Sequence, residues 1–163
     1  YDIPYTLAND LNMEMIGRIL STRYLESIRE REGGSYGVGV MGGCYRNPVN
    51  YAVLLMQFDT DPNKEEKLMS IIHEEVMTIV DNGPLADDLQ KEKESMLKDF
   101  EEDLEKNGYW RGTILHEYYQ HGIDYVAEYE KAVRDISAQS VQEMLRRLVD
   151  SGNMFEVVMM PAK

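Results

Sequence analysis

The spacing of apolar residues changes at residues 33 and 34, and this change constrains the fold of the chain more than any other feature. Before the pair Gly33-Gly34 the apolar residues recur at helical spacing, and after it they alternate as in a strand (Leu20, Tyr24, Leu25 and Ile28; then Tyr36, Val38 and Val40). Glycine readily adopts the positive φ that commonly ends a helix. The segment therefore predicts a helix that ends at the glycine pair and leads directly into a strand.

Arg29 and Tyr36 lie on opposite sides of this junction, seven residues apart. Arg29 falls in the last turn of the predicted helix and Tyr36 lies two residues past the glycine pair, so both side chains can point into the space above the junction. A cation and a phenol placed together are suited to binding a peptide carbonyl. The structural alternative is that Tyr36 packs on the core and that Arg29 interacts with the negative end of the helix dipole.

Capping residues, prolines and apolar spacing predict the remaining elements. The first helix is expected to run from Asn9 or Asp10 to about Arg31, with one apolar side (Met13, Ile16, Ile19, Leu20, Tyr24 and Ile28). The second strand of the hairpin that follows is apolar on both faces, which predicts a central position in the sheet. The expected strands are 35–45, 50–59 and 155–160, and the later helices are 61–82, 85–107, 109–120, 123–134 and 137–149. Strands gathered beside runs of helices predict an α+β fold, an antiparallel or mixed sheet with helices packed on one side.

Composition limits the classes of partner. The 163 residues are long enough for one domain with its own core, and the net charge of −13 disfavours binding to nucleic acid or to an anionic membrane. The single cysteine, Cys44, can form no internal disulfide and leaves the localisation open. Because the chain begins with neither methionine nor a signal-like apolar run, we expect residues 1–163 to be a single domain cut from a longer polypeptide.

Two strings resemble ligand-binding motifs. The letters of Gly37 to Gly42 fit a nucleotide-binding glycine loop, but a helix precedes them and a second strand follows, which is the wrong context. We instead expect Gly37 and Gly39 to leave room for a closely packed helix or for a peptide backbone.

His116, Glu117 and His121 form the second string. In a straight α-helix, a spacing of five residues rotates the second imidazole by about 140° from the first, so only a bent helix end could aim both at one ion. The sequence therefore predicts that this chain binds no metal and that the histidines are packing or surface residues.

The junction segment resembles a known family. A helix ending in Ile28-Arg29-Glu30, followed by Gly33-Gly34-Ser35-Tyr36-Gly37-Val38, is similar to the C-terminal half of the pitrilysin, insulin-degrading-enzyme and mitochondrial-processing-peptidase family of zinc metallopeptidases. The resemblance implies homologous α+β domains arranged as a clamshell around a peptide chamber. The zinc-bearing domain of the family has an inverted His-x-x-Glu-His motif, which the string beginning at His73 lacks. The chain thus resembles the C-terminal, non-zinc domain that faces the zinc.

The resemblance also implies roles for two residues. Tyr36 is expected to donate a hydrogen bond to the oxyanion that forms at the scissile carbonyl, and Arg29 to bind and position the substrate. The implied partners are the zinc-bearing half, on the same chain or another subunit, and unfolded peptide substrates. Zinc is then a cofactor of the partner half, and the isolated chain is expected to be inactive.

Two other functions remain open from the sequence. The family also contains non-catalytic core subunits that keep the fold, and this chain is alternatively such a structural relative. A helical protein-interaction domain is the third hypothesis, because aromatic residues are enriched at interfaces. Six aromatic residues cluster in the second half of the chain, and they fit a core equally well (Tyr109, Trp110, Tyr118, Tyr119, Tyr125 and Tyr129).

Overall fold

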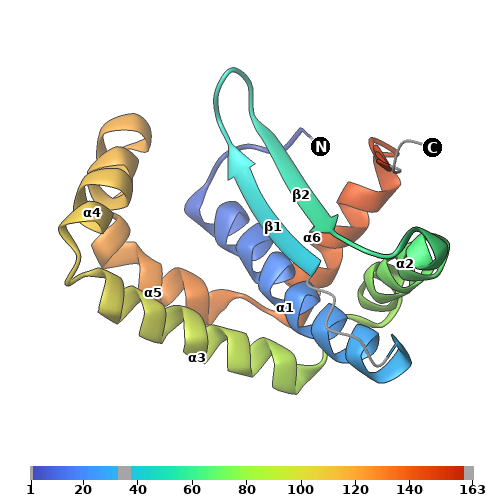
Figure 1. Ribbon diagram of the computed structural model, residues 1–163. Helices are drawn as coiled ribbons and strands as arrows, with labels where there is room; N and C mark the ends of the chain where they lie inside the picture. The colour runs from blue at the N-terminus through green and yellow to red at the C-terminus, as the bar shows by residue number, and fades with distance from the viewer. Residues whose placement is uncertain (1, 33–37, 160–163) are drawn as a thin grey trace.

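A computed structural model describes residues 2–32 and 38–159, except for the side chains of residues 29–32. Helices predominate around one antiparallel hairpin, which confirms the α+β prediction (Figure 1). The elements are α1 (Leu7–Glu32), β1 (Val38–Tyr45), β2 (Tyr51–Phe58), the short 3₁₀ turn η1 (Pro62–Lys64), α2 (Glu65–Asn82), α3 (Ala86–Asp103), α4 (Asn107–Tyr109), the π-helical turns η2 (Trp110–Ile114) and η3 (Glu117–His121), α5 (Tyr125–Asp135) and α6 (Ala138–Asp150). No helix in the described ranges is long and apolar enough to cross a membrane.

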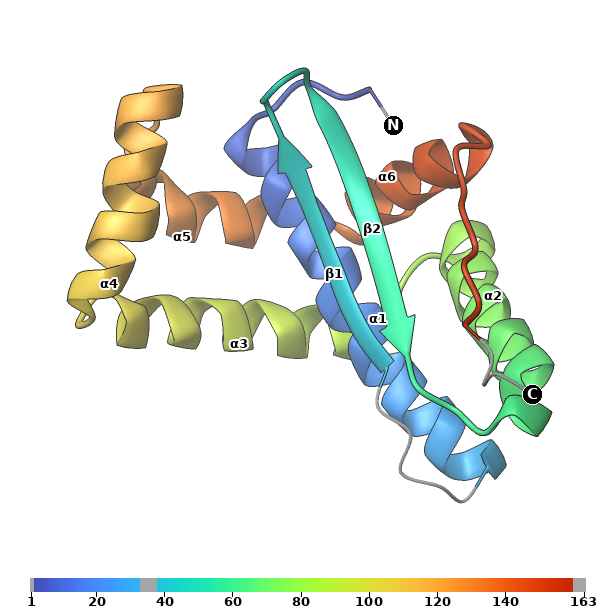
Figure 2. The same cartoon turned by 45° about the horizontal axis from the view of Figure 1, so that its top comes forward.

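Helix α1 is the centre of the molecule. It lies behind the hairpin, with α3 and α5 on one side and α2 and α6 on the other (Figures 1 and 2). The six apolar positions predicted for it are all buried, and Leu11 and Met15 are buried as well. These positions are spread around the helix, as expected for a helix covered on most sides.

The hairpin pairs in the register Val38↔Phe58 to Tyr45↔Tyr51. One face packs on the core, through residues that alternate along both strands (Val38, Val40, Cys44, Ala52, Leu54, Met56 and Phe58). The other face leaves the directly paired Met41 and Leu55 half exposed. The predicted central position of β2 is not found, because within the described ranges β2 pairs only with β1.

The predicted last strand is also wrong over its described part. Residues 155–159 form no strand, although Phe155, Val157 and Met159 alternate as a strand would. Alternation alone is insufficient, because a strand also requires a neighbouring edge for its backbone hydrogen bonds. The segment instead runs beside α2 (Figure 2), where His73 Nε2 lies 2.7 Å from Glu156 Oε1.

Several capping residues expected at helix ends are confirmed, but α1 begins at Leu7 and not at a cap on Asn9 or Asp10, because the Thr6 hydroxyl oxygen accepts the hydrogen bond from the Asn9 N–H. Asp61 caps η1 by accepting a hydrogen bond from the Asn63 N–H, with Pro62 at the first position. Gly83 ends α2 at φ +78°. Ser137 caps α6 in a reciprocal arrangement with Ser140.

Glycines bring α1 into direct contact with β1. A Cβ built on Gly42 would lie 2.0 Å from the Met13 carbonyl oxygen, and one built on Gly17 would lie 2.9 Å from the Gly42 nitrogen. The close packing of a helix predicted for Gly39 is found at Gly17 and Gly42 instead. Gly37 lies outside the described residues, and a Cβ on Gly39 would meet only the Gln57 carbonyl oxygen, at 3.8 Å.

We predict that Gly42→Ala destabilises the protein by about 1–3 kcal/mol, because its new methyl group would overlap the backbone of α1. Gly39→Ala is the matched control on the same strand, and it should be neutral or slightly stabilising because its methyl group has space and the unfolded chain loses entropy. Urea unfolding midpoints measure both. Equal effects of the two substitutions would contradict the close helix–strand contact.

Candidate functional site

The sequence places the candidate site at the junction between α1 and β1. Arg29 lies in the last turn of α1, which ends at Glu32, but its side chain is outside the described part of the structure. Tyr36 lies outside the described residues altogether. Both side chains of the predicted pair therefore lie outside the described part of the chain, whereas the flanks of the junction lie within it.

Buried groups on α1 hold the helix close to its C-terminal end. Tyr24 and Ile28 are almost fully buried. The Tyr24 hydroxyl donates to the Ile72 carbonyl oxygen of α2 at 3.1 Å and also lies 3.2 Å from the Met56 sulfur of β2. Burial raises the pKa of Tyr24, and the nearby Glu75 carboxylate raises it further to a smaller extent. The phenol therefore stays a neutral donor at physiological pH.

A buried carboxylate joins the same end of α1 to α2. Glu75 is only 5% exposed, and it accepts a hydrogen bond from the Ser27 hydroxyl. Its other oxygen lies 3.1 Å from Arg23 Nε. Since both carboxylate oxygens are bound by residues of α1, the last turns of this helix are fixed to α2 by charge as well as by apolar packing.

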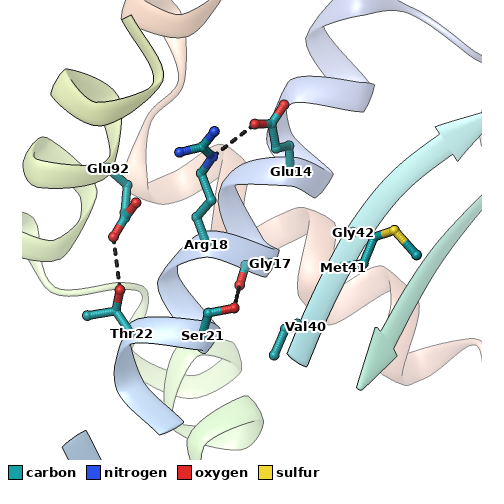
Figure 3. A pocket seen from close by; sticks show the side chains of 9 residues that line it. All are labelled: Glu14, Gly17, Arg18, Ser21, Thr22, Val40, Met41, Gly42 and Glu92. Atoms are coloured by element: carbon teal, nitrogen blue, oxygen red, sulfur yellow. Dashed lines mark hydrogen bonds and ion pairs between the residues drawn. The ribbon is translucent and has the colours of Figure 1, made fainter. Parts of the chain in front are cut away.

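The opposite side of α1 borders a surface pocket of about 300 Å³ between α1, β1 and α3 (Figure 3). Its charged side chains are paired: Arg18 lies 2.9 Å from both Glu14 and Asp99, and the Thr22 hydroxyl donates to Glu92 at 3.0 Å. These contacts link α1 to α3. We assign the pocket to packing of the two helices.

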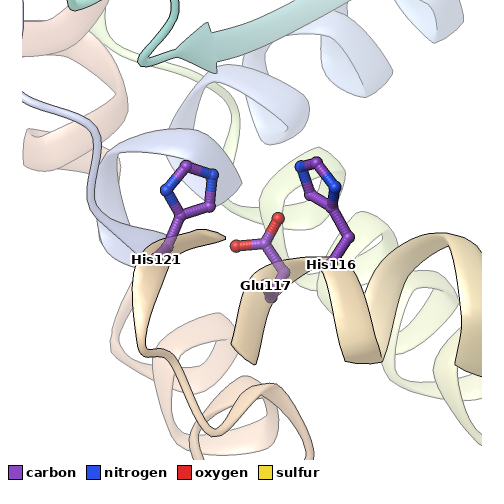
Figure 4. Close-up of side chains that lie close together, drawn as sticks. All are labelled: His116, Glu117 and His121. Atoms are coloured by element: carbon purple, nitrogen blue, oxygen red, sulfur yellow. The ribbon is translucent and has the colours of Figure 1, made fainter. Parts of the chain in front are cut away.

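A second group of polar side chains gathers at the end of the helical segment 107–121. The ring centroids of His116 and His121 are 5.8 Å apart, and the Glu117 carboxylate lies between the rings (Figure 4). The expectation that a five-residue spacing keeps the imidazoles apart is therefore wrong. The reason is the π-helical turn η3, whose i to i+5 hydrogen-bond pattern brings residues five apart onto one side.

A pocket of about 360 Å³ separates this group from the hairpin and the start of α1. Asp10 lines it and accepts a hydrogen bond from the Cys44 N–H at 2.8 Å. Burial raises the pKa of Asp10 from 3.8 to about 6, and burial likewise raises the pKa of the Cys44 thiol to about 12. At neutral pH the pocket thus contains an ionised carboxylate beside a protonated thiol.

The aromatic cluster predicted as an interaction surface divides into two groups. Tyr125 and Tyr129 are buried, and Tyr129 stacks on Phe100 at 4.2 Å between ring centroids. Tyr118 and Tyr119 are 60% and 79% exposed. The buried tyrosines belong to the core, and sequence spacing did not separate them from the exposed pair.

The chain is similar to known proteins in sequence and in fold. Residues 1–96 match the family described as the peptidase M16 inactive domain, and no curated protein matches significantly. Among solved structures, the chain is similar to the periplasmic protease PqqL from Escherichia coli (17% identity, TM-score 0.72) and to a mutant of the ferredoxin protease FusC in complex with Arabidopsis ferredoxin (14% identity, TM-score 0.71). Each likeness covers 90% of this chain and 16% of the other, and it shows a shared fold. The resemblance found in the sequence is confirmed at the level of the family.

We predict that Glu75→Ala lowers the free energy of unfolding by about 2 kcal/mol, because Arg23 and Ser27 lose a shared buried acceptor. Glu66, exposed in the first turn of the same helix, provides the control: Glu66→Ala should cost less than about 1 kcal/mol, because it loses only a favourable interaction with the helix dipole. Chemical denaturation at neutral pH measures both values. Similar losses in both variants would show that the carboxylate does not fasten α1 to α2.

Proposed function

The chain belongs to the family of the peptidase M16 inactive domain, and on this premise we propose that it is the C-terminal, substrate-binding, non-zinc domain of a zinc metallopeptidase that hydrolyses unfolded peptides. The family match carries the proposal, because residues 1–96 include α1, the hairpin and both Arg29 and Tyr36. The partner is then the zinc-bearing half, on the same polypeptide or on another subunit. The two halves would enclose the peptide as a clamshell.

We assign the zinc of this reaction to the other half. The 163 residues contain no His-x-x-Glu-His string. The nearest match begins at His73 and lacks the second histidine, and its Glu75 is already bound by Arg23 and Ser27. When bound in the partner, zinc polarises the scissile carbonyl and activates a water molecule. The isolated chain should therefore hydrolyse no peptide.

Tyr36 and Arg29 are the residues through which this chain would act. The Tyr36 hydroxyl would donate a hydrogen bond to the oxyanion that develops at the scissile carbonyl. The Arg29 guanidinium would bind the peptide carbonyl and support the same negative charge. The contacts of Tyr24, Ser27 and Arg23 favour this role, because a group that stabilises a transition state must be held in place before the reaction.

We predict that Tyr36→Phe lowers kcat roughly 100- to 1,000-fold with little change in KM, the size typical of losing one oxyanion donor. The measurement is hydrolysis of a quenched flexible peptide by this chain mixed with its zinc-bearing half. Co-purification of the two halves controls for assembly. Unchanged hydrolysis in the assembled variant would remove Tyr36 from the reaction.

We predict that Arg29→Ala lowers kcat/KM at least tenfold in the same assay, because the peptide carbonyl loses a charged donor. Arg31 is the matched control, since it lies two residues further along the same helix and breaks the seven-residue spacing to Tyr36. Arg31→Ala should leave hydrolysis unchanged. Absence of any activity in a folded, assembled mixture would instead favour the non-catalytic core-subunit function.

A further inference from the structure

The end of the segment 107–121 carries a side-chain group outside the junction of α1 and β1. His116, Glu117 and His121 each offer one ligand atom, and these three atoms lie within 4.8 Å of one another. Tetrahedral coordination at 2.0–2.1 Å separates ligand atoms by about 3.3 Å. Movements of about 1 Å by each side chain would therefore bring the three atoms around one ion.

Glu117 is held in position by a neighbouring segment. Its side chain is buried, with 8% exposure, and its Oε2 accepts a hydrogen bond of 2.6 Å from the Tyr5 hydroxyl. A second contact to Tyr5 comes from His121, whose ring stacks on the tyrosine ring at 4.1 Å. One residue thus orients two of the three candidate ligands, as outer groups commonly do around metal sites.

His121 also has an unfilled polar atom. Its Nδ1 is buried and has no hydrogen-bond partner within the described part of the chain. A buried polar atom without a partner costs about 1–3 kcal/mol, so such atoms are rare and call for a physical explanation. Coordination of a cation at this nitrogen would supply the interaction that it lacks.

The surroundings can accommodate an ion and a further ligand. The three side chains line the pocket of about 360 Å³. Asp10 lines the same pocket and adds a second carboxylate, while Arg46 contributes one positive charge from the hairpin. The two carboxylates, of Asp10 and Glu117, outnumber the one guanidinium, of Arg46, which favours a cation. The volume of the pocket leaves room for a water molecule.

We propose that His116, Glu117 and His121 bind one divalent transition-metal ion of the zinc type, with water in the fourth position. Two imidazoles and one carboxylate are a donor set that suits zinc, whereas magnesium and calcium require oxygen ligands. Bound there, the ion would cross-link His116, Glu117 and His121 at one helical turn, beside the N-terminal segment whose Tyr5 contacts two of them. The proposed site lies on the present chain and differs from the expectation, drawn from straight-helix geometry, that the chain binds no metal.

Isothermal titration of the 163-residue chain with zinc chloride in a non-chelating buffer tests the proposal. We expect one saturable site, and no saturable binding of magnesium or calcium under the same conditions. His116→Gln and Glu117→Gln should each weaken zinc binding at least tenfold. The control is His73→Gln, which removes the third histidine of the chain, on α2, and should leave the zinc affinity unchanged.

Tyr5→Phe keeps the ring that stacks on His121 and removes only the hydroxyl that orients Glu117. Loss of such an outer contact should weaken zinc binding about 10- to 100-fold. The ligand-field spectrum of cobalt bound to the unmodified chain should show tetrahedral coordination, and this measurement does not depend on any variant folding. Absence of a saturable zinc site, or a zinc affinity unchanged by both His116→Gln and Glu117→Gln, would overturn the proposal.

Discussion

The rest of the structure depends on the contact between α1 and β1 through Gly17 and Gly42. Because a single methyl group on Gly42 would overlap the Met13 carbonyl oxygen, the helix lies as close to the strand as two backbones allow. This contact fixes the middle of α1 against the second half of β1. The proposed substrate-binding residues Arg29 and Tyr36 belong to the stretch of sequence that joins these two parts.

Polar contacts also hold α1 in position. The buried helix α1 carries Arg18, Thr22, Arg23 and Ser27 among its apolar residues, and each of these polar side chains has a partner on α2 or α3. Such pairs are required, because a buried polar group without a partner costs more than its pairing contributes. Glu75 is bound by α1 through both of its oxygens, which fixes the rotation of α1 about its own axis and its distance from α2. Apolar packing alone is less directional and fixes these two quantities less precisely.

Local sequence signals predicted much of the fold. Features that depend on contacts between residues distant in sequence were not predicted. The apolar positions of α1, the hairpin and the caps at Asp61 and Ser137 followed from spacing and capping chemistry. The close packing expected at Gly39 is found at Gly42, because the glycines of this strand look alike in sequence until the register with α1 is known. The candidate metal site was missed because no residue type marks a π-helical turn, and because Tyr5, which orients Glu117, is distant in sequence.

The π-helical turn gives the proposed metal site its physical basis. In a straight α-helix, positions 116 and 121 would diverge by about 140°, and the two imidazoles could not face one ion. The turn is instead set by the protein's own contacts: Gly122 ends it at φ +70°, and Tyr5 holds Glu117 and His121 from the N-terminal segment. Since these contacts already hold Glu117 and His121, only small movements of these two side chains would accompany metal binding, and little of the binding free energy would be offset by ordering them. A π-helical turn is uncommon and frequently marks a functional position, which a site preformed in this way would explain.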